Sequence, residues 1–365
     1  LITLTRSLTG ARYHAGCTCE IFTDGKIKFD ALADDLMAAQ HYILLQYYIF
    51  EDDKVGTRIA DILCDRARAG VKVRVIYDHL GSFEVSNSFF RRMREAGVEV
   101  EPFFKVSLLH ITTRLNWRNH RKLCVIDGTV GYIGGMNVAD RYIDGGRKFE
   151  SWRDTHMRVP GPAVASLQYA FAVDWNFMGL PLIGESAAPD ARALPRRKSG
   201  VINDAGMQLV TGGPTGEWSN LGFVLLAAVA VARKRVWIHT PYFLPSESLL
   251  RALQSAALAR VDVRVMMPRH SDSAMLTYAS RSYVTEALRA GIKIYFYEAG
   301  MLHSKAIVID DDISSVGSTN FDFRSLEHNF ECNMMIYSHE ANRRLRRLFT
   351  DDLSQSTHST LYLSY

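Results

Sequence analysis

The chain has 365 residues, a length that favours two domains or two fused halves over one small core. Hydrophobic residues make up 47% and charged residues 22%, which argues against disorder as the main state. The net charge of +4 suits an anionic ligand or surface but does not distinguish nucleic acid from lipid, and five scattered cysteines indicate neither a disulfide framework nor a zinc site.

The hydrophobic runs of the sequence are too short to span a bilayer, and no signal peptide is visible. The most apolar run, Leu221–Ala232, is bounded by polar residues and predicts a buried helix. Because the chain opens on Leu1 and not on methionine, this finding says little about the whole protein.

Taken in chain order, the predicted elements occur twice. In the first half, strands are predicted at Tyr42–Phe50, Ala69–Asp78 and Ala96–Phe104, separated by charged stretches that favour helix. In the second half, similar runs occur at Val236–Leu244, Ala259–Pro268 and Ala290–Glu298. This repeated alternation predicts an α/β fold made of two homologous halves, each a mixed sheet flanked by helices.

The boundary between the halves is predicted from composition. Gly184–Gly200 is rich in alanine, proline and charge, as linkers are. We therefore expect an N-terminal half at 1–183, a linker at 184–205 and a C-terminal half at 206–365.

One short motif appears in both halves, 183 residues apart. "NHRKLCVIDGTVGYIGGMN" begins at Asn119, and "LHSKAIVIDDDISSVGSTN" begins at Leu302. Without a gap, the first copy matches the second at five positions: His120, Lys122, Asp127, Gly134 and Asn137 match His303, Lys305, Asp310, Gly317 and Asn320. Two complete copies make a chance match, or a purely structural role for each histidine, a poor explanation.

The motif residues predict a phosphate site. His and Lys two apart on a strand point to the same face, so two halves packed about a pseudo-two-fold axis can direct both pairs into one cleft. Lys122, Lys305, Asn137 and Asn320 can donate to the phosphate oxygens, while one imidazole attacks phosphorus and the other protonates the leaving oxygen. The lysines supply the positive charge, so we expect neither a metal nor another cofactor.

Asp127 and Asp310 complete the two motifs, and we group them with the catalytic residues by position. Both are predicted at turns, where a carboxylate can accept from backbone N–H groups. Their expected contribution is therefore more structural than chemical.

The duplicated His-x-Lys-x4-Asp-x6-Gly-[Gly/Ser]-x-Asn motif resembles that of the phospholipase D superfamily. Flanking segments such as "LQYYIFEDDKVG", "TPYFLPSESLL" and "GSTNFDFRSLEHNFE" look like its bacterial cardiolipin synthase branch, over about Thr23 to Leu353. The resemblance implies a phosphatidyltransferase that joins two phosphatidylglycerol molecules into cardiolipin, releasing glycerol through a phosphohistidine. It implies the bacterial inner membrane as location, with the branch's N-terminal membrane helices missing from this chain.

Residue roles follow from the resemblance. It implies His120 as nucleophile and His303 as general acid and base, with the reverse order as the alternative. It also implies an acidic residue after each motif that orients the histidine of the other half. Glu331 fits this role in the second copy, and Asp154 fits it in the first, with Glu150 as its rival.

Other functions remain as alternatives. A phospholipase D that hydrolyses lipids would differ only in its second acceptor. A superfamily nuclease would need a basic, aromatic groove, and +4 over 365 residues is slight, so we expect lipid and membrane partners and no nucleic acid. A catalytically idle scaffold would be favoured by a degenerate motif copy, and both copies are intact.

Overall fold

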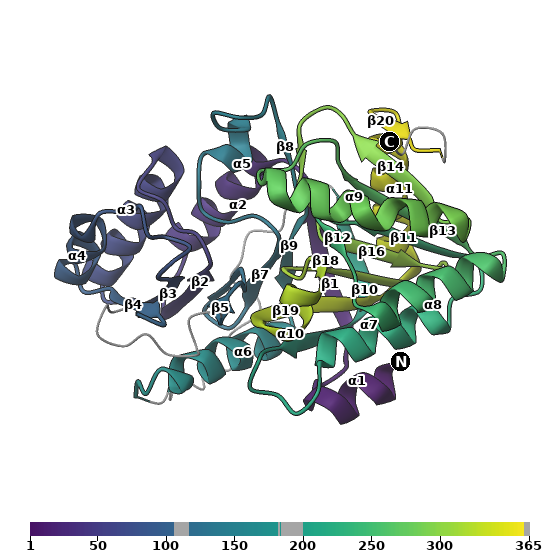
Figure 1. Ribbon diagram of the computed structural model, residues 1–365. Helices are drawn as coiled ribbons and strands as arrows, with labels where there is room; N and C mark the ends of the chain where they lie inside the picture. Colours follow the sequence, from purple (N-terminus) through teal and green to yellow (C-terminus); the bar gives the residue numbers. More distant parts are fainter. Residues whose placement is uncertain (106–116, 182, 184–199, 361–365) are drawn as a thin grey trace.

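Two sheets, one from each half of the chain, join through a pair of central strands in the computed structural model, which describes residues 1–105, 117–181, 183 and 200–360. In Figure 1 most of the first half (purple to teal) lies on the left and the second half (green to yellow) on the right, while the purple N-terminal helix lies at the lower right. The path of paired strands is β20-β14-β13-β11-β16-β17-β19-β10-β1-β9-β7-β6-β2-β3-β4. The predicted fold class, two α/β halves with mixed sheets, is confirmed.

The first half contains the strands β1 (His14–Phe22), β2 (Tyr42–Tyr47), β3 (Lys72–Asp78), β4 (Glu99–Phe103), β5 (Arg118–Asn119), β6 (Leu123–Ile126), β7 (Val130–Gly134), β8 (Trp152–Arg153) and β9 (His156–Pro160). Its helices are α1 (Ile2–Thr9), α2 (Gly25–Met37), α3 (Lys54–Arg68), α4 (Asn87–Glu95), α5 (Arg141–Asp144) and α6 (Val164–Phe177). β2, β3 and β4 are parallel, and the β6–β7 hairpin follows antiparallel to β2. The three strands predicted from alternation are present with shorter bounds.

The second half repeats this order with the strands β10 (Val201–Gly212), β11 (Arg235–His239), β12 (Phe243–Leu244), β13 (Asp262–Pro268), β14 (Lys293–Tyr297), β15 (Met301–Leu302), β16 (Ala306–Ile309), β17 (Ile313–Gly317), β18 (Phe321–Asp322), β19 (Asn329–Tyr337) and β20 (Ser356–His358). Its helices are α7 (Asn220–Ala230), α8 (Glu247–Leu258), α9 (Ala274–Arg289), α10 (Phe323–Glu327) and α11 (His339–Leu353). The helix predicted in Leu221–Ala232 is α7, and its face with Leu221, Val224 and Leu225 is buried.

The expected linker needs a correction at its C-terminal end. Residues 184–199 lie outside the described residues, but residues 201–205 belong to β10, which pairs with β1 and β19. The compositional signal stopped at Gly200, and the strand begins directly after it. The division into halves at 1–183 and 206–365 otherwise stays a prediction.

The halves also meet through two short strand pairs next to the motifs. β5, directly before His120, pairs in parallel with β19 of the second half. β15, directly before His303, pairs in parallel with β8 of the first half. Each motif therefore starts against the other half of the protein.

Among the described residues, no helix combines the length and apolar character needed to cross a bilayer.

Candidate active site

Each motif histidine is held by backbone and side chain of the opposite half. The His120 backbone N–H donates to the carbonyl of Phe330 at 2.9 Å, and the His303 N–H donates to the carbonyl of Arg153 at 2.8 Å. The next residue in each case is an acid. Nδ1 of His120 lies 2.8 Å from Oε1 of Glu331, and Nδ1 of His303 lies 2.7 Å from Oδ2 of Asp154.

Of the two acids considered for the first half, the structure places Asp154 against the His303 ring. Asp154 is buried against His303, whereas Glu150 is exposed. Nδ1 of each ring faces a carboxylate, and among the described residues no hydrogen-bond partner is seen for Nε2 in either ring. A carboxylate that fixes the tautomer and orientation of an imidazole is a recurring device in enzymes.

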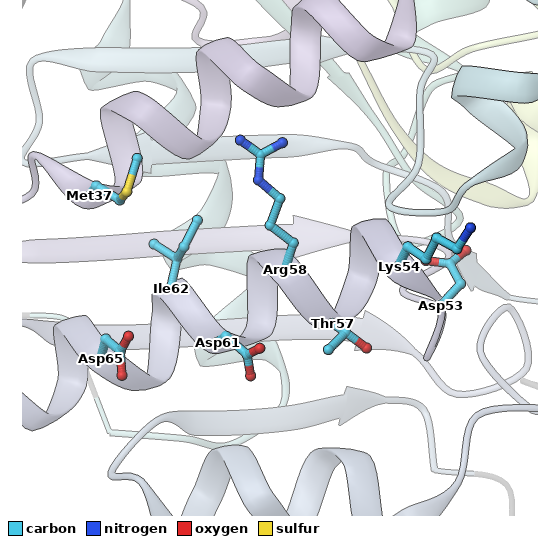
Figure 2. A pocket seen from close by; sticks show the side chains of 8 residues that line it. All are labelled: Met37, Asp53, Lys54, Thr57, Arg58, Asp61, Ile62 and Asp65. Atoms are coloured by element: carbon cyan, nitrogen blue, oxygen red, sulfur yellow. The ribbon is translucent and has the colours of Figure 1, made fainter.

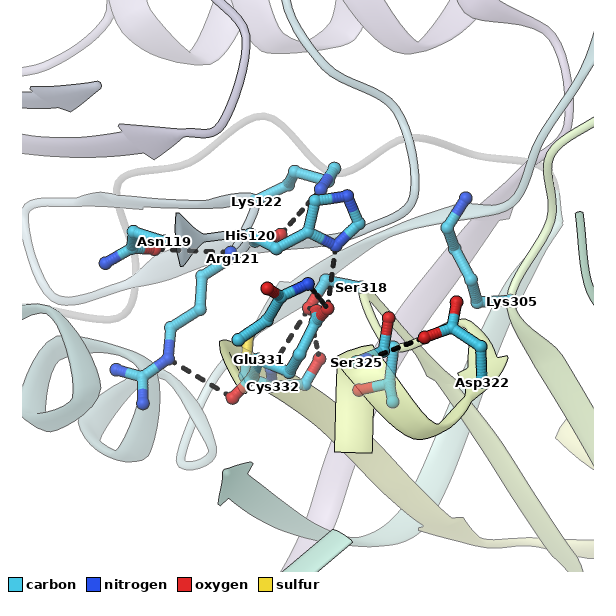
Figure 3. Close-up of polar contacts among 12 residues, drawn as sticks. Asn119, His120, Arg121, Lys122, Lys305, Ser318, Asp322, Ser325, Glu331 and Cys332 are labelled. Atoms are coloured by element: carbon cyan, nitrogen blue, oxygen red, sulfur yellow. Dashed lines mark hydrogen bonds and ion pairs between the residues drawn. The ribbon is translucent and has the colours of Figure 1, made fainter. Parts of the chain in front are cut away.

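The carboxylate partners differ in their own support. Glu331 accepts a second hydrogen bond, through Oε2, from the Ser318 hydroxyl, and Figure 3 shows both residues beside the His120 ring. At the matching position the first copy has Gly135, where a Cβ would lie only 2.1 Å from Oδ1 of Asp154. That oxygen instead accepts from the Thr155 backbone N–H at 2.7 Å. The glycine leaves space for the Asp154 carboxylate. The carboxylate is therefore supported by a serine hydroxyl in one copy and by a backbone N–H in the other.

The motif lysines lie beside their own histidines. Nζ of Lys122 donates to the carbonyl of His120 at 2.5 Å. Nζ of Lys305 contacts the His303 carbonyl and also lies 2.7 Å from His303 Nδ1. Both lysines are buried, Lys122 completely. Figure 3 shows Lys122 and Lys305 reaching in from opposite halves.

Burial and mutual repulsion disfavour positive charge in this site. Burial lowers the pKa of Lys122 to about 7 and that of Lys305 to about 8, and the neighbouring carboxylates counteract this only in part. Burial lowers the pKa of His120, and burial together with the Lys305 ammonium lowers that of His303 to about 4. An anion placed among these groups would raise all four pKa values, so the site is electrostatically complementary to a phosphodiester.

The two motif asparagines, which are predicted to donate to phosphate, also contact other groups of the protein. Oδ1 of Asn137 accepts from the Ile49 N–H at 3.1 Å, and its Nδ2 donates to the Tyr142 hydroxyl at 2.5 Å. One N–H of its amide remains for another acceptor. Asn320 is buried near Asp322, and its Oδ1 has no hydrogen-bond partner among the described residues.

Asp127 and Asp310 lie at the far ends of the motif strands. Asp127 accepts from the backbone N–H groups of Gln40, His41 and Tyr42, each at 2.8 Å. Asp310 accepts in the same way from Arg233, Lys234 and Arg235. The sequence predicted that these carboxylates would accept from N–H groups of their own turns. The structure shows that they accept instead from N–H groups at the start of the neighbouring strand.

Replacing Asp127 with alanine is therefore expected to lower stability and to leave the activity per folded molecule nearly unchanged. Three N–H groups would lose their acceptor, which costs roughly 3 kcal/mol. Urea unfolding and specific activity, measured on the same sample, check this, with Asp127→Asn as the milder control because asparagine also tolerates the left-handed φ of 49° found here. Lost activity at unchanged stability would show a chemical role instead.

Sequence reasoning did not single out two neighbours of His120. The Tyr48 ring lies edge-on to the His120 ring, with centroids 4.9 Å apart, and the Lys122 ammonium lies over it at 5.4 Å. Arg121 is buried between the motif residues, with its guanidinium 2.6 Å from Asp174 and 3.2 Å from the carbonyl of Glu331. The available signal for Arg121 was its position between the two motif residues His120 and Lys122.

A surface hollow of about 760 Å³ between α2 and α3 lies apart from these groups (Figure 2). None of its lining residues belongs to a motif: they are Met37, Asp53, Lys54, Thr57, Arg58, Asp61, Ile62 and Asp65. Within the described ranges, no group of three or more His, Cys, Asp or Glu side chains is arranged to hold a metal ion.

Comparison with known proteins agrees with this geometry. A family model described as "Cardiolipin synthase, PLD-like domain" matches residues 32–168 and again 225–353, one match in each half. "Cardiolipin synthase 2" of Bacillus anthracis is 44% identical over 339 residues, which cover 92% of this chain and 64% of that protein. "Major cardiolipin synthase ClsA" of Bacillus subtilis (strain 168) is 42% identical over 336 residues, covering 92% and 68%. The chain thus spans about two thirds of the length of these relatives.

Among solved structures, a phosphatidylserine synthase of Haemophilus influenzae Rd KW20 superposes with a TM-score of 0.73, covering 98% of this chain and 91% of that one. At 13% identity this likeness supports the fold alone. The family model covers more than half of the chain, and the Bacillus relatives exceed 40% identity over nearly all of it. The chain therefore belongs to the cardiolipin synthase family with phospholipase D-like domains.

Proposed function

We propose that this protein transfers a phosphatidyl group from one phosphatidylglycerol to another, giving cardiolipin and glycerol at the bacterial inner membrane. The observation that carries the proposal is the crossed pairing of the motifs. Each half supplies a His-Lys pair together with the carboxylate that holds the other half's histidine. The names of the relatives, cardiolipin synthases, give the substrate class.

In the first step, Nε2 of His120 attacks phosphorus while the bond from phosphorus to the headgroup glycerol oxygen breaks. Protonated His303 gives its Nε2 proton to that oxygen, and glycerol leaves. The phosphodiester anion raises the pKa of His303 when it binds, which supplies the proton that the empty site disfavours. Lys122 and Lys305 donate to the non-bridging oxygens, and Asn137 and Asn320 help to orient them.

In the second step, His303 takes the proton from a hydroxyl of the second phosphatidylglycerol. The hydroxyl oxygen attacks phosphorus, the bond between phosphorus and His120 breaks, and cardiolipin is released. Glu331 balances the charge on the phosphorylated His120 ring, and Asp154 does so on protonated His303. No step requires a metal ion.

Product analysis tests the proposal. With phosphatidylglycerol vesicles and a chelator present, we expect cardiolipin and glycerol as the main products, because a lipid hydroxyl held in the site competes with water. Chromatography of the lipids and an enzymatic glycerol assay measure both. Phosphatidic acid as the main product, with cardiolipin absent at high phosphatidylglycerol density, would identify a hydrolase instead.

The rate should also fall on the alkaline side. The two lysines bind phosphate only when protonated, and their lowered pKa values mean that this charge is lost as the pH rises through about 7 to 8. We expect kcat/KM, which reports the free enzyme, to decline over this window, well below the range of an ordinary lysine. A flat profile up to pH 10 would contradict the assignment of the lysines as the phosphate-binding charges.

A further inference from the structure

An ordered loop beside His120 exposes large apolar side chains. Phe83 is 73% exposed and Leu80 is 37% exposed, both between β3 and α4. Two hydrogen bonds hold the loop in place: Oδ1 of Asp78 accepts from the Leu80 and Gly81 N–H groups at 3.0 and 2.9 Å. A Cβ at Gly81 would collide with Tyr48, the residue whose ring lies against His120. The loop is therefore one layer away from the reactive ring.

The second half exposes apolar side chains at the matching place, the start of α9. Met275 is 74% exposed and Tyr278 is 71% exposed. The segment before them is held by side chains of both halves: the Tyr242 hydroxyl donates to Oδ1 of Asp272, and Nζ of Lys148 donates to its carbonyl at 3.1 Å. Asp272 also lies near enough to His303 to oppose the lowering of its pKa. This segment is thus one layer from the second histidine.

A third exposed ring follows the second motif. Phe323 begins α10 and is 48% exposed. The preceding Asp322 caps that helix, accepting from the Ser325 N–H at 2.6 Å, and Figure 3 shows both residues beside Lys305 and Glu331. We call Leu80, Phe83, Met275, Tyr278 and Phe323 the apolar rim.

The rim has the properties of a docking surface. Large apolar side chains that are exposed on several hydrogen-bonded segments, each leading to a residue of the site, mark an interaction surface more than an accident of folding. Exposed basic side chains lie in or against the same segments, namely Lys148, Arg269 and Arg324, together with the exposed acids Asp52, Glu84 and Glu327. The basic groups can contact an anionic headgroup, so apolar contact should supply most of the affinity and charge the preference for lipid type.

We propose that the apolar rim is the surface by which the protein docks on a bilayer of anionic phospholipid. The inference rests on the proposed function, because a lipid substrate must leave its bilayer to reach His120 and His303. A rim one layer from both histidines lets the headgroup enter while the acyl chains remain among lipid. A protein partner on the same rim would obstruct that entry, which is why a bilayer is the occupant that fits.

The test is vesicle binding by the 365-residue chain and by a Phe83→Ser, Met275→Ser double variant. Leu258→Ser is the matched control, because Leu258 is 69% exposed at the C-terminal end of α8. The seven-residue strand β13 follows α8 and leads to α9, so Leu258 lies roughly 20 Å from the start of α9. Cosedimentation with phosphatidylglycerol vesicles should show roughly tenfold weaker binding for each rim side chain removed, and the control should stay within about twofold of the parent chain.

Turnover separates this inference from the proposed function. With a short-chain phosphatidylglycerol kept below its micelle concentration, the double variant should match the parent chain within about twofold, while its turnover on vesicles falls with binding. Equal vesicle binding by the double variant and the parent chain would overturn the docking surface, even if cardiolipin is formed. So would rim substitutions that abolish self-association in gel filtration and leave vesicle binding intact. Rim-dependent binding without cardiolipin formation would support docking and refute the proposed function.

Discussion

Replacing His120 with alanine is expected to reduce transfer by more than about 10⁴-fold and to remove the covalent phosphoenzyme, because no other imidazole occupies its place against Glu331. His303→Ala should cost about 10²–10⁴-fold, the usual range for a lost general acid. A substrate with a better leaving group than glycerol should partly restore the His303 variant, since such a group departs without a proton.

Trapping of the phosphoenzyme by rapid acid quench, together with the rate on both substrates, measures these effects. His339→Ala is the control, because the His339 side chain is 70% exposed and lies on α11, outside both motifs. Rescue of the His120 variant in place of the His303 variant would reverse the two roles.

Asp154→Asn is expected to lower kcat by about 10²–10⁴-fold with little change in KM. The asparagine amide presents a donor to His303 Nδ1, which favours the wrong tautomer and withdraws the charge that stabilises the protonated ring. Glu150→Gln makes the same chemical change on an exposed acid four residues away and should leave kcat within about twofold.

If Asp154 positions and charges His303, the Asp154→Asn variant should also show a shifted pH profile. Loss of the carboxylate removes the group that raises the pKa of His303, so the limb of the kcat profile that reports protonated His303 should move to lower pH. Equal losses in Asp154→Asn and Glu150→Gln, or a loss that appears only in thermal stability, would refute it.

Much of this arrangement could be predicted from the sequence, because the duplicated motif carries its own symmetry. Two gap-free copies of His, Lys and Asp required two similar halves, and the alternation of strands around them gave an α/β fold. The structure places the acids Glu331 and Asp154 against the histidines of the opposite halves. The chemical roles of these residues stay predictions that the substitutions above test.

The sequence could not predict contacts that depend on tertiary packing. Asn137 was predicted as a phosphate donor, and the sequence did not show that its amide also ties Ile49 to Tyr142, which only the packed halves reveal. The motif pattern allows either glycine or serine at Ser318, and only the structure shows that this hydroxyl donates to Glu331.

Register is the second limit. The strand run at Tyr42–Phe50 resembles the run at Val236–Leu244 when Gln46 is aligned with Thr240. The sheet instead makes Gln46 equivalent to His239, since the two pair with Leu123 and Ala306 at corresponding points of the motif strands. Apolar strands of similar composition look alike at neighbouring offsets, so only their pairing fixes the register.

The central strand β10 has a consequence for how the site works. On one side, β10 pairs with β19 from Gly206 opposite Tyr337 to Gly212 opposite Glu331. On its other side β10 pairs with β1, and β1 pairs with β9, which begins two residues after Asp154. The segments that carry the two carboxylates are therefore linked through consecutively paired strands. Moving one half away from the other would break the pairing of β1 with β10, so the spacing of the two imidazoles is set when the chain folds and not when a lipid arrives. Such a site contributes its dipoles and charges with little reorganisation energy at the moment of phosphoryl transfer.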